Sequence, residues 1–280
     1  MKFIFKEQIK SPVFYHAVFI TVMLFANSAC AEEADYQFGV GLLSFDYTEY
    51  RDNGEFLDGE TGLIPGIVLK RKQYHQRLYT ELVGQLYGNT IKYDGQTQGG
   101  IPVKTDSVAV IVDTHFKLGM RLKNIHEPYI GLGYRYWYRQ ILNGQDINGA
   151  AVAGLLEEYY WFYGILGYTA NFAVSEKVSL GFDLRYTKML NAKMDVDFLG
   201  FNNYDDSQVN LGNESGARFA IPVKINLNED ALIVTPYYEI IDIGRSNSVR
   251  LTSGGVPVSA TIYEPRSETR NVGIEIMWLW

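Results

Sequence analysis

The sequence has 280 residues, of which 47% are hydrophobic, 20% charged and 14% aromatic, and its formal net charge at pH 7 is -7. This apolar content excludes intrinsic disorder, and an acidic chain without a Lys/Arg-rich run argues against nucleic-acid binding. Tyrosine (21 residues) and glycine (27) are abundant while proline (8) is scarce, which favours a protein made mainly of β-strands.

Residues 1–31 have the pattern of a cleaved secretory signal peptide. Lysines in the first ten residues precede an apolar run over 12–25, and Ala29-Cys30-Ala31 supplies the small residues of a cleavage site. The alternative is an N-terminal membrane anchor, for which the run is short. Cleavage would remove the only cysteine, so the mature chain, residues 32–280, would form one domain without disulfides.

The mature chain shows period-two alternation of apolar and polar residues, which recurs roughly every 25 residues. In residues 105–122, an apolar face running from Val108 to Leu122 lies opposite Asp113, His115 and Lys117. The segments predicted to be strands are 36–50, 62–72, 78–93, 105–122, 129–139, 155–172, 178–186, 218–227, 231–244 and 271–280.

The connections between these segments alternate in length. The short ones are 73–76, 123–127, 175–177 and 228–230; the long ones are 51–61, 94–104, 143–153, 191–213 and 245–264. Outer-membrane barrels have short periplasmic turns, long external loops and an even number of strands. We therefore predict an all-β fold: a single antiparallel up-and-down transmembrane β-barrel of ten strands, closed because hydrocarbon tolerates no open sheet edge.

A secreted β-sandwich is the soluble alternative, because its strands also alternate. Aromatic residues favour the barrel, since belts of aromatics mark the two membrane interfaces. The predicted belt near the long loops contains Tyr47, Tyr50, Tyr87, Tyr93, Tyr138, Tyr159 and Tyr186. The predicted belt near the short turns contains Phe38, Tyr129, Phe172, Trp278 and Trp280.

The C-terminal segment carries a more specific signal. From Gly273 the chain ends with Ile274, Ile276, Trp278 and Trp280 at alternate positions. This resembles the last strand of Gram-negative outer-membrane β-barrel proteins, which ends in an aromatic residue. The resemblance implies location in the cell outer membrane, assembly by the barrel-assembly machinery, and contact with outer-membrane lipids and lipopolysaccharide.

The polar side of the strands predicts the contents of the barrel lumen. Alternation directs a mixed set of charges inward, and such charges can pair across a narrow lumen. The set is Glu81, Asp113, His115, Lys117, Arg121, Arg135, Arg139, Asp183, Arg185, Arg218, Lys224, Glu239 and Glu275. We interpret it as a structural polar network that fills the lumen, which argues against a wide porin.

No candidate for catalysis or metal binding is well supported by the sequence. Asp113 and His115 could form a carboxylate–imidazole pair, but no serine is placed to complete a nucleophilic set. Asp205-Asp206 suggests the acidic pair of an omptin-like protease, yet no histidine accompanies it at the rim. The acidic run from Asp52 to Glu60 does not match a Ca²⁺-binding loop, and we interpret it as a solvated external loop.

The sequence therefore predicts a non-catalytic outer-membrane barrel. It would act as a structural component of the envelope or through its five long external loops, in adhesion or ligand contact, without cofactor, metal or nucleic acid. Two alternatives stay open: a narrow transport pore for small ions or solutes, and an outer-membrane lipid- or peptide-modifying enzyme. The sequence does not identify the external ligand.

Overall fold

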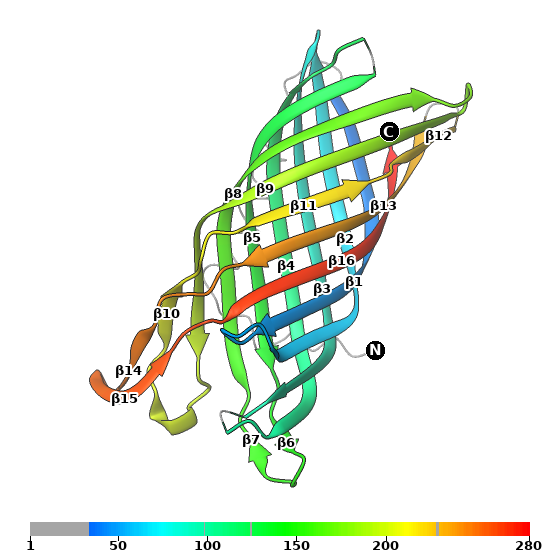
Figure 1. Ribbon diagram of the computed structural model, residues 1–280. Coiled ribbons are helices and arrows are strands. Elements are labelled where there is room, and N and C mark those ends of the chain that lie inside the picture. Colours follow the sequence, from blue (N-terminus) through cyan, green and yellow to red (C-terminus); the bar gives the residue numbers. More distant parts are fainter. Residues whose placement is uncertain (1–33, 98, 124, 228–229) are drawn as a thin grey trace.

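The computed structural model describes residues 34–97, 99–123, 125–227 and 230–280. In these residues ten antiparallel strands form a closed up-and-down barrel, as Figure 1 shows. The barrel closes because the first strand pairs with the last, for example Val40 with Ile276. The predicted signal peptide lies outside the described residues. No helix in the described part of the chain is long and apolar enough to cross a membrane.

The strands of the wall are mostly long, and each pairs with both of its neighbours. They are β1 (Ala34–Tyr50), β2 (Phe56–His75), β3 (Leu78–Gln96), β4 (Pro102–Met120), β5 (His126–Ile141), β8 (Leu155–Ala173), β9 (Val178–Asp197), β11 (Ser215–Ala220) with β12 (Val223–Leu227), β13 (Asp230–Ile243) and β16 (Arg266–Leu279). The outer face of the wall is apolar, with Phe38, Val40 and Leu42 of β1 exposed on it, as a lipid-facing surface requires.

One wall strand is divided into two pieces. β11 ends at Ala220 and β12 begins at Val223, and both pieces pair with β9 and β13. Pro222, which lies between them, has no N–H for the ladder, although its carbonyl oxygen accepts the N–H of Gly181 at 2.7 Å. The sequence predicted one continuous strand here, and the proline explains the interruption.

The end of the barrel with the predicted long loops contains more pairing than the sequence suggested. The strands β2, β3, β4 and β9 extend into segments expected to be loops, so the first two long connections shrink to 51–55 and 97–101. Further short elements are β6 (Gly144–Asp146), β7 (Ala151–Val152), η1 (Phe201–Asn203), β10 (Ser207–Asn210), β14 (Val249–Ser253) and β15 (Val256–Ile262). In Figure 1 the β14–β15 hairpin projects at the end opposite the C-terminus of β16.

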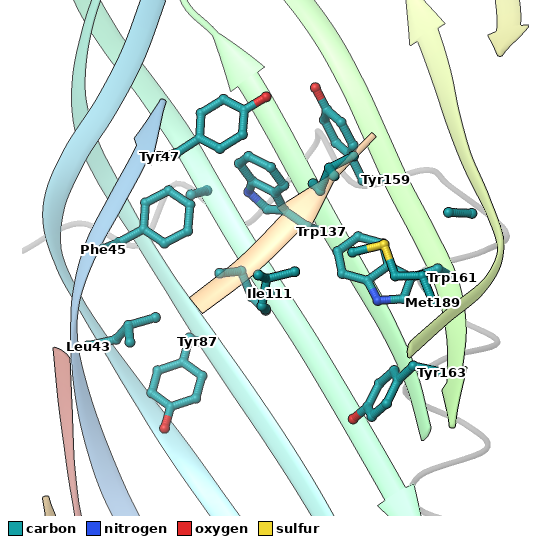
Figure 2. Packing of buried hydrophobic residues seen from close by; sticks show 14 of the residues in the cluster. Leu43, Phe45, Tyr47, Tyr87, Ile111, Trp137, Tyr159, Trp161, Tyr163 and Met189 are labelled. Atoms are coloured by element: carbon teal, nitrogen blue, oxygen red, sulfur yellow. The ribbon is translucent and has the colours of Figure 1, made fainter. Parts of the chain in front are cut away.

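Several tyrosines assigned to the outer aromatic belts instead point into the barrel. Tyr47, Tyr87, Tyr93 and Tyr159 are buried, as is Tyr129 near the short turns. Figure 2 shows Tyr47 and Tyr159 beside Trp137 in the interior, with ring centroids 4.9 and 4.7 Å from that of Trp137. The belt prediction was wrong for these five residues, because the lumen also has an aromatic layer.

Aromatic rings also cover lumen-facing glycines on neighbouring strands. A Cβ on Gly133 would lie 2.2 Å from the ring of Tyr163, which is directly opposite it in the ladder. The pairs in which a tyrosine faces a glycine in this way are Tyr79–Gly119, Tyr129–Gly167, Tyr163–Gly133, Tyr237–Gly273 and Tyr87–Gly66. The glycines therefore leave room for rings that fill the narrow lumen.

Candidate functional site in the barrel lumen

The lumen near the short turns is occupied by ion pairs. The Glu127 carboxylate accepts from Lys72 Nζ at 2.6 Å and from Arg121 Nε at 3.0 Å. One layer further in, Lys117 Nζ donates to Glu81 Oε1 at 2.8 Å, and the Lys117 ammonium lies 4.7 Å from the centroid of the Tyr129 ring. These contacts connect β2, β3, β4 and β5 across the interior.

The middle of the lumen contains a branched network around Arg135. Its Nε donates to Asp113 Oδ2 at 2.8 Å, and its Nη2 lies 3.2 Å from Glu239 Oε2. Glu239 also accepts from Arg185 Nη2 at 3.0 Å, and His115 Nδ1 lies 3.1 Å from Asp113 Oδ1. Residues of β4, β5, β9 and β13 are thereby linked across the barrel.

Two further contacts complete this part of the lumen. Arg218 Nη2 donates to Glu275 Oε1 at 2.9 Å, and the amide of Gln85 donates to the same oxygen at 3.0 Å. Asp183 accepts from Tyr129 and Thr169 at 2.9 and 2.7 Å. Together with the pairs above, six carboxylates (Glu81, Asp113, Glu127, Asp183, Glu239, Glu275) share this space with six cations (Lys72, Lys117, Arg121, Arg135, Arg185, Arg218). We call these twelve residues the balanced network.

Most lumen residues chosen from the sequence meet in the balanced network, but not all. Lys224 lies on the inward side of β12, opposite Ile233, and no carboxylate of the described residues lies within ion-pair distance of it. Lys72 and Glu127 belong to the network, although the sequence reasoning missed them. Both continue the alternation of their strands, but Lys72 is the last residue of the predicted strand 62–72 and Glu127 lies in the predicted turn 123–127.

The outer end of the lumen has a different charge balance. Arg139, predicted to face inward, is only 1% exposed. Its guanidinium contacts four carboxylates: Glu60 at 2.9 Å, Glu49 at 2.8 Å, Glu157 at 2.6 Å and Asp58 at 3.4 Å. A fifth acid, Glu264, is connected to this group by the hydroxyls of Tyr47 and Tyr159. We call Arg139 with these five acids the acidic cluster.

Two tyrosines connect Glu264 to the other acids of the cluster. The Tyr47 hydroxyl lies 2.9 Å from Glu49 Oε1 and 3.0 Å from Glu264 Oε1, and Tyr159 lies 2.8 Å from the same Glu264 oxygen. A hydroxyl has one hydrogen to donate, so a proton on Glu264 would supply the hydrogen for a second of these contacts. Burial raises the pKa of Glu264 well above its usual range, and the charges of Glu49 and Glu157 raise it further.

The five acids of the cluster are the largest omission of the sequence reasoning. Asp58 and Glu60 were expected in a solvated loop, but they lie on β2 and point inward, and Glu60 is fully buried. Ser107 donates to Glu60 at 2.6 Å. Glu49 lies within the predicted strand 36–50 and continues the inward series of Phe45 and Tyr47, but the assignment of Tyr47 to the outer belt concealed that series.

A small cavity lies between the balanced network and the acidic cluster. Its volume is about 30 Å³, which suits roughly two water molecules. Apolar groups such as Phe45 and Trp161 form one side, and Arg135 and Glu239 form the other. Five buried polar atoms without a hydrogen-bond partner belong to its lining residues: the Tyr87 hydroxyl, Trp137 Nε1, Arg185 Nε, Thr269 Oγ1 and Asn271 Oδ1.

The residues considered for catalysis lie at two separate places in the structure. His115 and Asp113 are in contact, but both are buried, and Arg185 Nη1 lies 3.5 Å from the other ring nitrogen. Asp205 caps backbone N–H groups of the β14–β15 hairpin. In the part of the chain that the structure describes, no group of three or more His, Cys, Asp or Glu side chains is arranged to hold a metal ion.

Three of the C-terminal residues proposed as an assembly signal lie on one face of β16, and the fourth, Trp280, directly follows the strand. Ile274, Ile276, Trp278 and Trp280 are exposed on the outside of the wall. Trp278 is opposite Phe38 of β1, so this face lies at the seam where the barrel closes.

A closed barrel with an apolar outside and a charged inside is the architecture of a small outer-membrane β-barrel protein. Comparison with protein-family models finds no match, and comparison with the sequences of curated proteins finds none either. Among solved structures, the chain is similar to the outer membrane protease OmpT from Escherichia coli, with 10% identity, a TM-score of 0.58, and coverage of 89% of this chain and 96% of that one.

Weaker likenesses include two other barrels. The toluene transporter TbuX of Ralstonia pickettii has 9% identity and a TM-score of 0.40, covering 89% of each chain. Neisserial surface protein A has 10% identity and a TM-score of 0.34, covering 88% of this chain and 99% of that one. The similarity to the protease OmpT concerns the barrel fold alone, and this fold points to the outer membrane.

Proposed function

We propose that this protein is a non-catalytic barrel of the bacterial outer membrane that acts through its external end or as a structural part of the envelope. The observation that carries this proposal is the balanced network. Its side chains link opposite walls at several levels, and they occupy the width that a solute would need. A filled barrel of this kind presents its loops on a rigid support.

A likeness in fold to a protease does not by itself bring protease activity to this chain. The protein OmpT is described as a protease, but its similarity here is limited to the fold. His115 is 4% exposed and Asp113 is 2% exposed, so an external substrate would not reach this pair. The proposal therefore includes no catalytic step.

A narrow transport pore is the second candidate, and the small cavity favours it. A polar chamber in the middle of the lumen could carry water or a small ion if the network on one side and the acidic cluster on the other opened. Because both sides are closed by charge-assisted hydrogen bonds, the filled barrel is the better supported function.

Conductance of the purified protein in planar lipid bilayers tests the proposal. The unmodified protein should show little steady conductance. Removing both Arg135 and Arg185 by substitution to alanine should raise it, because bulk is lost and Glu239 loses both cations. Arg270→Ala, which changes an exposed arginine, is the control. A large, stable conductance in the unmodified protein, unchanged in the double variant, would favour the pore.

A further inference from the structure

The external end carries a group of exposed apolar side chains on two connected segments. Leu199 is 47% exposed, Phe201 45% and Val256 65%. Leu199 and Phe201 belong to the connection that follows β9, and Val256 lies at the tip of the β14–β15 hairpin. We call residues 198–206 together with the hairpin tip, residues 253–257, the outer platform. Grouped apolar side chains on an outer surface mark interaction sites more often than scattered ones.

Asp205 fastens the two segments of the outer platform together. Its Oδ1 accepts the N–H of Gly254 at 3.0 Å, and its Oδ2 accepts the N–H of Gly255 at 2.9 Å. The backbone N–H of Asp205 donates in turn to the carbonyl of Thr252 at 2.9 Å. The hairpin tip is therefore fixed relative to η1, and a partner would meet a preformed surface.

The backbone of the platform is strained where it exposes its apolar residues. Leu199 has φ of 52° and Asn202 has φ of 52°, both in the left-handed region, which is unfavourable for a bulky residue such as leucine. Asp197 Oδ1 accepts the N–H of Leu199 at 2.7 Å and holds this conformation. Since the Leu199 side chain is exposed, the strain is not compensated by core packing, and strain of this kind is concentrated at functional sites.

The charges around the apolar group are mainly negative. Asp195, Asp197 and Asp206 lie near one another in β9 and the connection that follows it, and Asp206 has a raised pKa because of partial burial and the nearby Asp197, Asp205 and Asp195. Asp195 accepts from the Tyr160 hydroxyl at 3.2 Å and from Gln208 at 2.7 Å. The cations on the adjoining strands are already engaged: Lys193 donates to Gln208 at 3.2 Å, and Arg250 Nε donates to the carbonyl of Val258 at 2.6 Å. The surface therefore combines exposed apolar groups with an excess of carboxylates.

We propose that the outer platform is a docking surface for a basic protein segment that carries apolar side chains. Its apolar residues would cover Leu199, Phe201 and Val256, and its cations would approach Asp195 and Asp206. Complementary charge would mainly speed association, while the apolar contacts would slow dissociation. The inference rests on the proposed action through the external end, and it names the region and the chemistry of the partner.

Binding of a labelled peptide tests the docking surface. The protein is placed in nanodiscs of neutral phosphatidylcholine, and a fluorescein-labelled peptide of lysine and leucine is titrated by fluorescence anisotropy against empty nanodiscs. Binding is expected, with an affinity that falls as salt rises. A peptide of glutamate and leucine should bind far more weakly. The double variant Phe201→Ser, Val256→Ser should bind the basic peptide about tenfold more weakly.

Matched variants separate the platform from the rest of the external end. Ile147→Ser removes an apolar residue that is 73% exposed in the connection between β6 and β7, and it should leave binding unchanged. Asp206→Asn should weaken binding, whereas Glu55→Gln in the first connection should not. Heat-modifiable migration confirms that each variant is folded, and Val256→Ser alone replaces the double variant if that one does not fold.

Three results would overturn the docking surface. They are no binding of the basic peptide, equal binding of the acidic peptide, and loss of binding in Ile147→Ser rather than in the platform variants. The last result would move the contact to another connection and leave the proposed function intact. Failure of the proposed function is a separate outcome, since it would appear as a large conductance of the unmodified barrel.

Discussion

The balanced network and the acidic cluster both bury charged side chains in the lumen, but they differ in the ratio of carboxylates to cations. In the network six carboxylates face six cations, so loss of one group leaves a neighbour that can partly compensate. In the cluster five carboxylates depend on Arg139 and on protons. Buried ions are tolerated only when paired and hydrogen-bonded, so the cluster should be the more sensitive region to substitution and to pH.

The largest effect is expected from Arg139→Met. This change removes the only cation of the acidic cluster, so the barrel should lose about 3–5 kcal/mol of stability at neutral pH. Urea unfolding in lipid vesicles, followed by tryptophan fluorescence, measures the loss. Arg218→Met is the matched control in the balanced network, and its loss should be smaller because Glu275 keeps the amide of Gln85. Equal losses would contradict the distinction between the two regions.

A smaller effect, and one that depends on pH, is expected from Glu264→Gln. The pKa of Glu264 is raised in the folded protein, so the folded barrel binds the Glu264 proton more tightly than the unfolded chain does. The stability that this proton contributes is fully present below the ordinary glutamate pKa of about 4.3, and it is lost as pH rises through the pKa of the folded state. Glutamine imitates the protonated carboxyl. The variant should differ from the unmodified protein by about 1 kcal/mol or less at pH 5, and it should be the more stable protein at pH 8.

The unfolding free energy measured between pH 5 and pH 8 checks this prediction. Gln85→Ala, which changes an uncharged side chain in contact with the balanced network, is the control and should keep the pH dependence of the unmodified protein. A Glu264→Gln variant with the same slope as the unmodified barrel would show that Glu264 is not the carboxyl that retains the proton.

The smallest effect is expected from Lys224→Gln. Lys224 faces inward on β12 but has no carboxylate of the described residues within ion-pair distance, so stability should change by no more than about 0.5 kcal/mol. Lys117→Gln, which would leave Glu81 without its 2.8 Å partner, should cost clearly more in the same urea measurement. A large loss for Lys224→Gln would mean that the balanced network extends to β12.

The sequence predicted the barrel and much of the balanced network, because both follow from strict alternation. Asp113, His115 and Lys117 occupy every second position of a strand with clear alternation, so the sequence predicts that all three point into the lumen. The ion-pair partners of these residues could not be predicted from the sequence, because pairing across a lumen depends on which strands face each other. Arg135 meets Glu239, which lies four wall strands further along the chain.

The acidic cluster could not be predicted for two physical reasons. Asp58 and Glu60 follow residues typical of turns, and the turn is much shorter than their composition suggested. Tyr47 and Tyr159 were assigned to a membrane interface, where tyrosine is common, but a lumen filled with aromatic rings uses the same residue type. Only the three-dimensional arrangement distinguishes the two environments.

The tyrosine–glycine pairs of the wall have a consequence for how the strands find their partners. A strand that slips by two residues keeps its apolar side outward, so hydrophobicity alone does not detect the error. On β5 and β8, Tyr163 faces Gly133 and Tyr129 faces Gly167. A slip in one direction would set Tyr129 against Ile165, and a slip in the other would set Tyr163 against Arg135. The two rings thus act as a register check that penalises misalignment both ways while the barrel assembles.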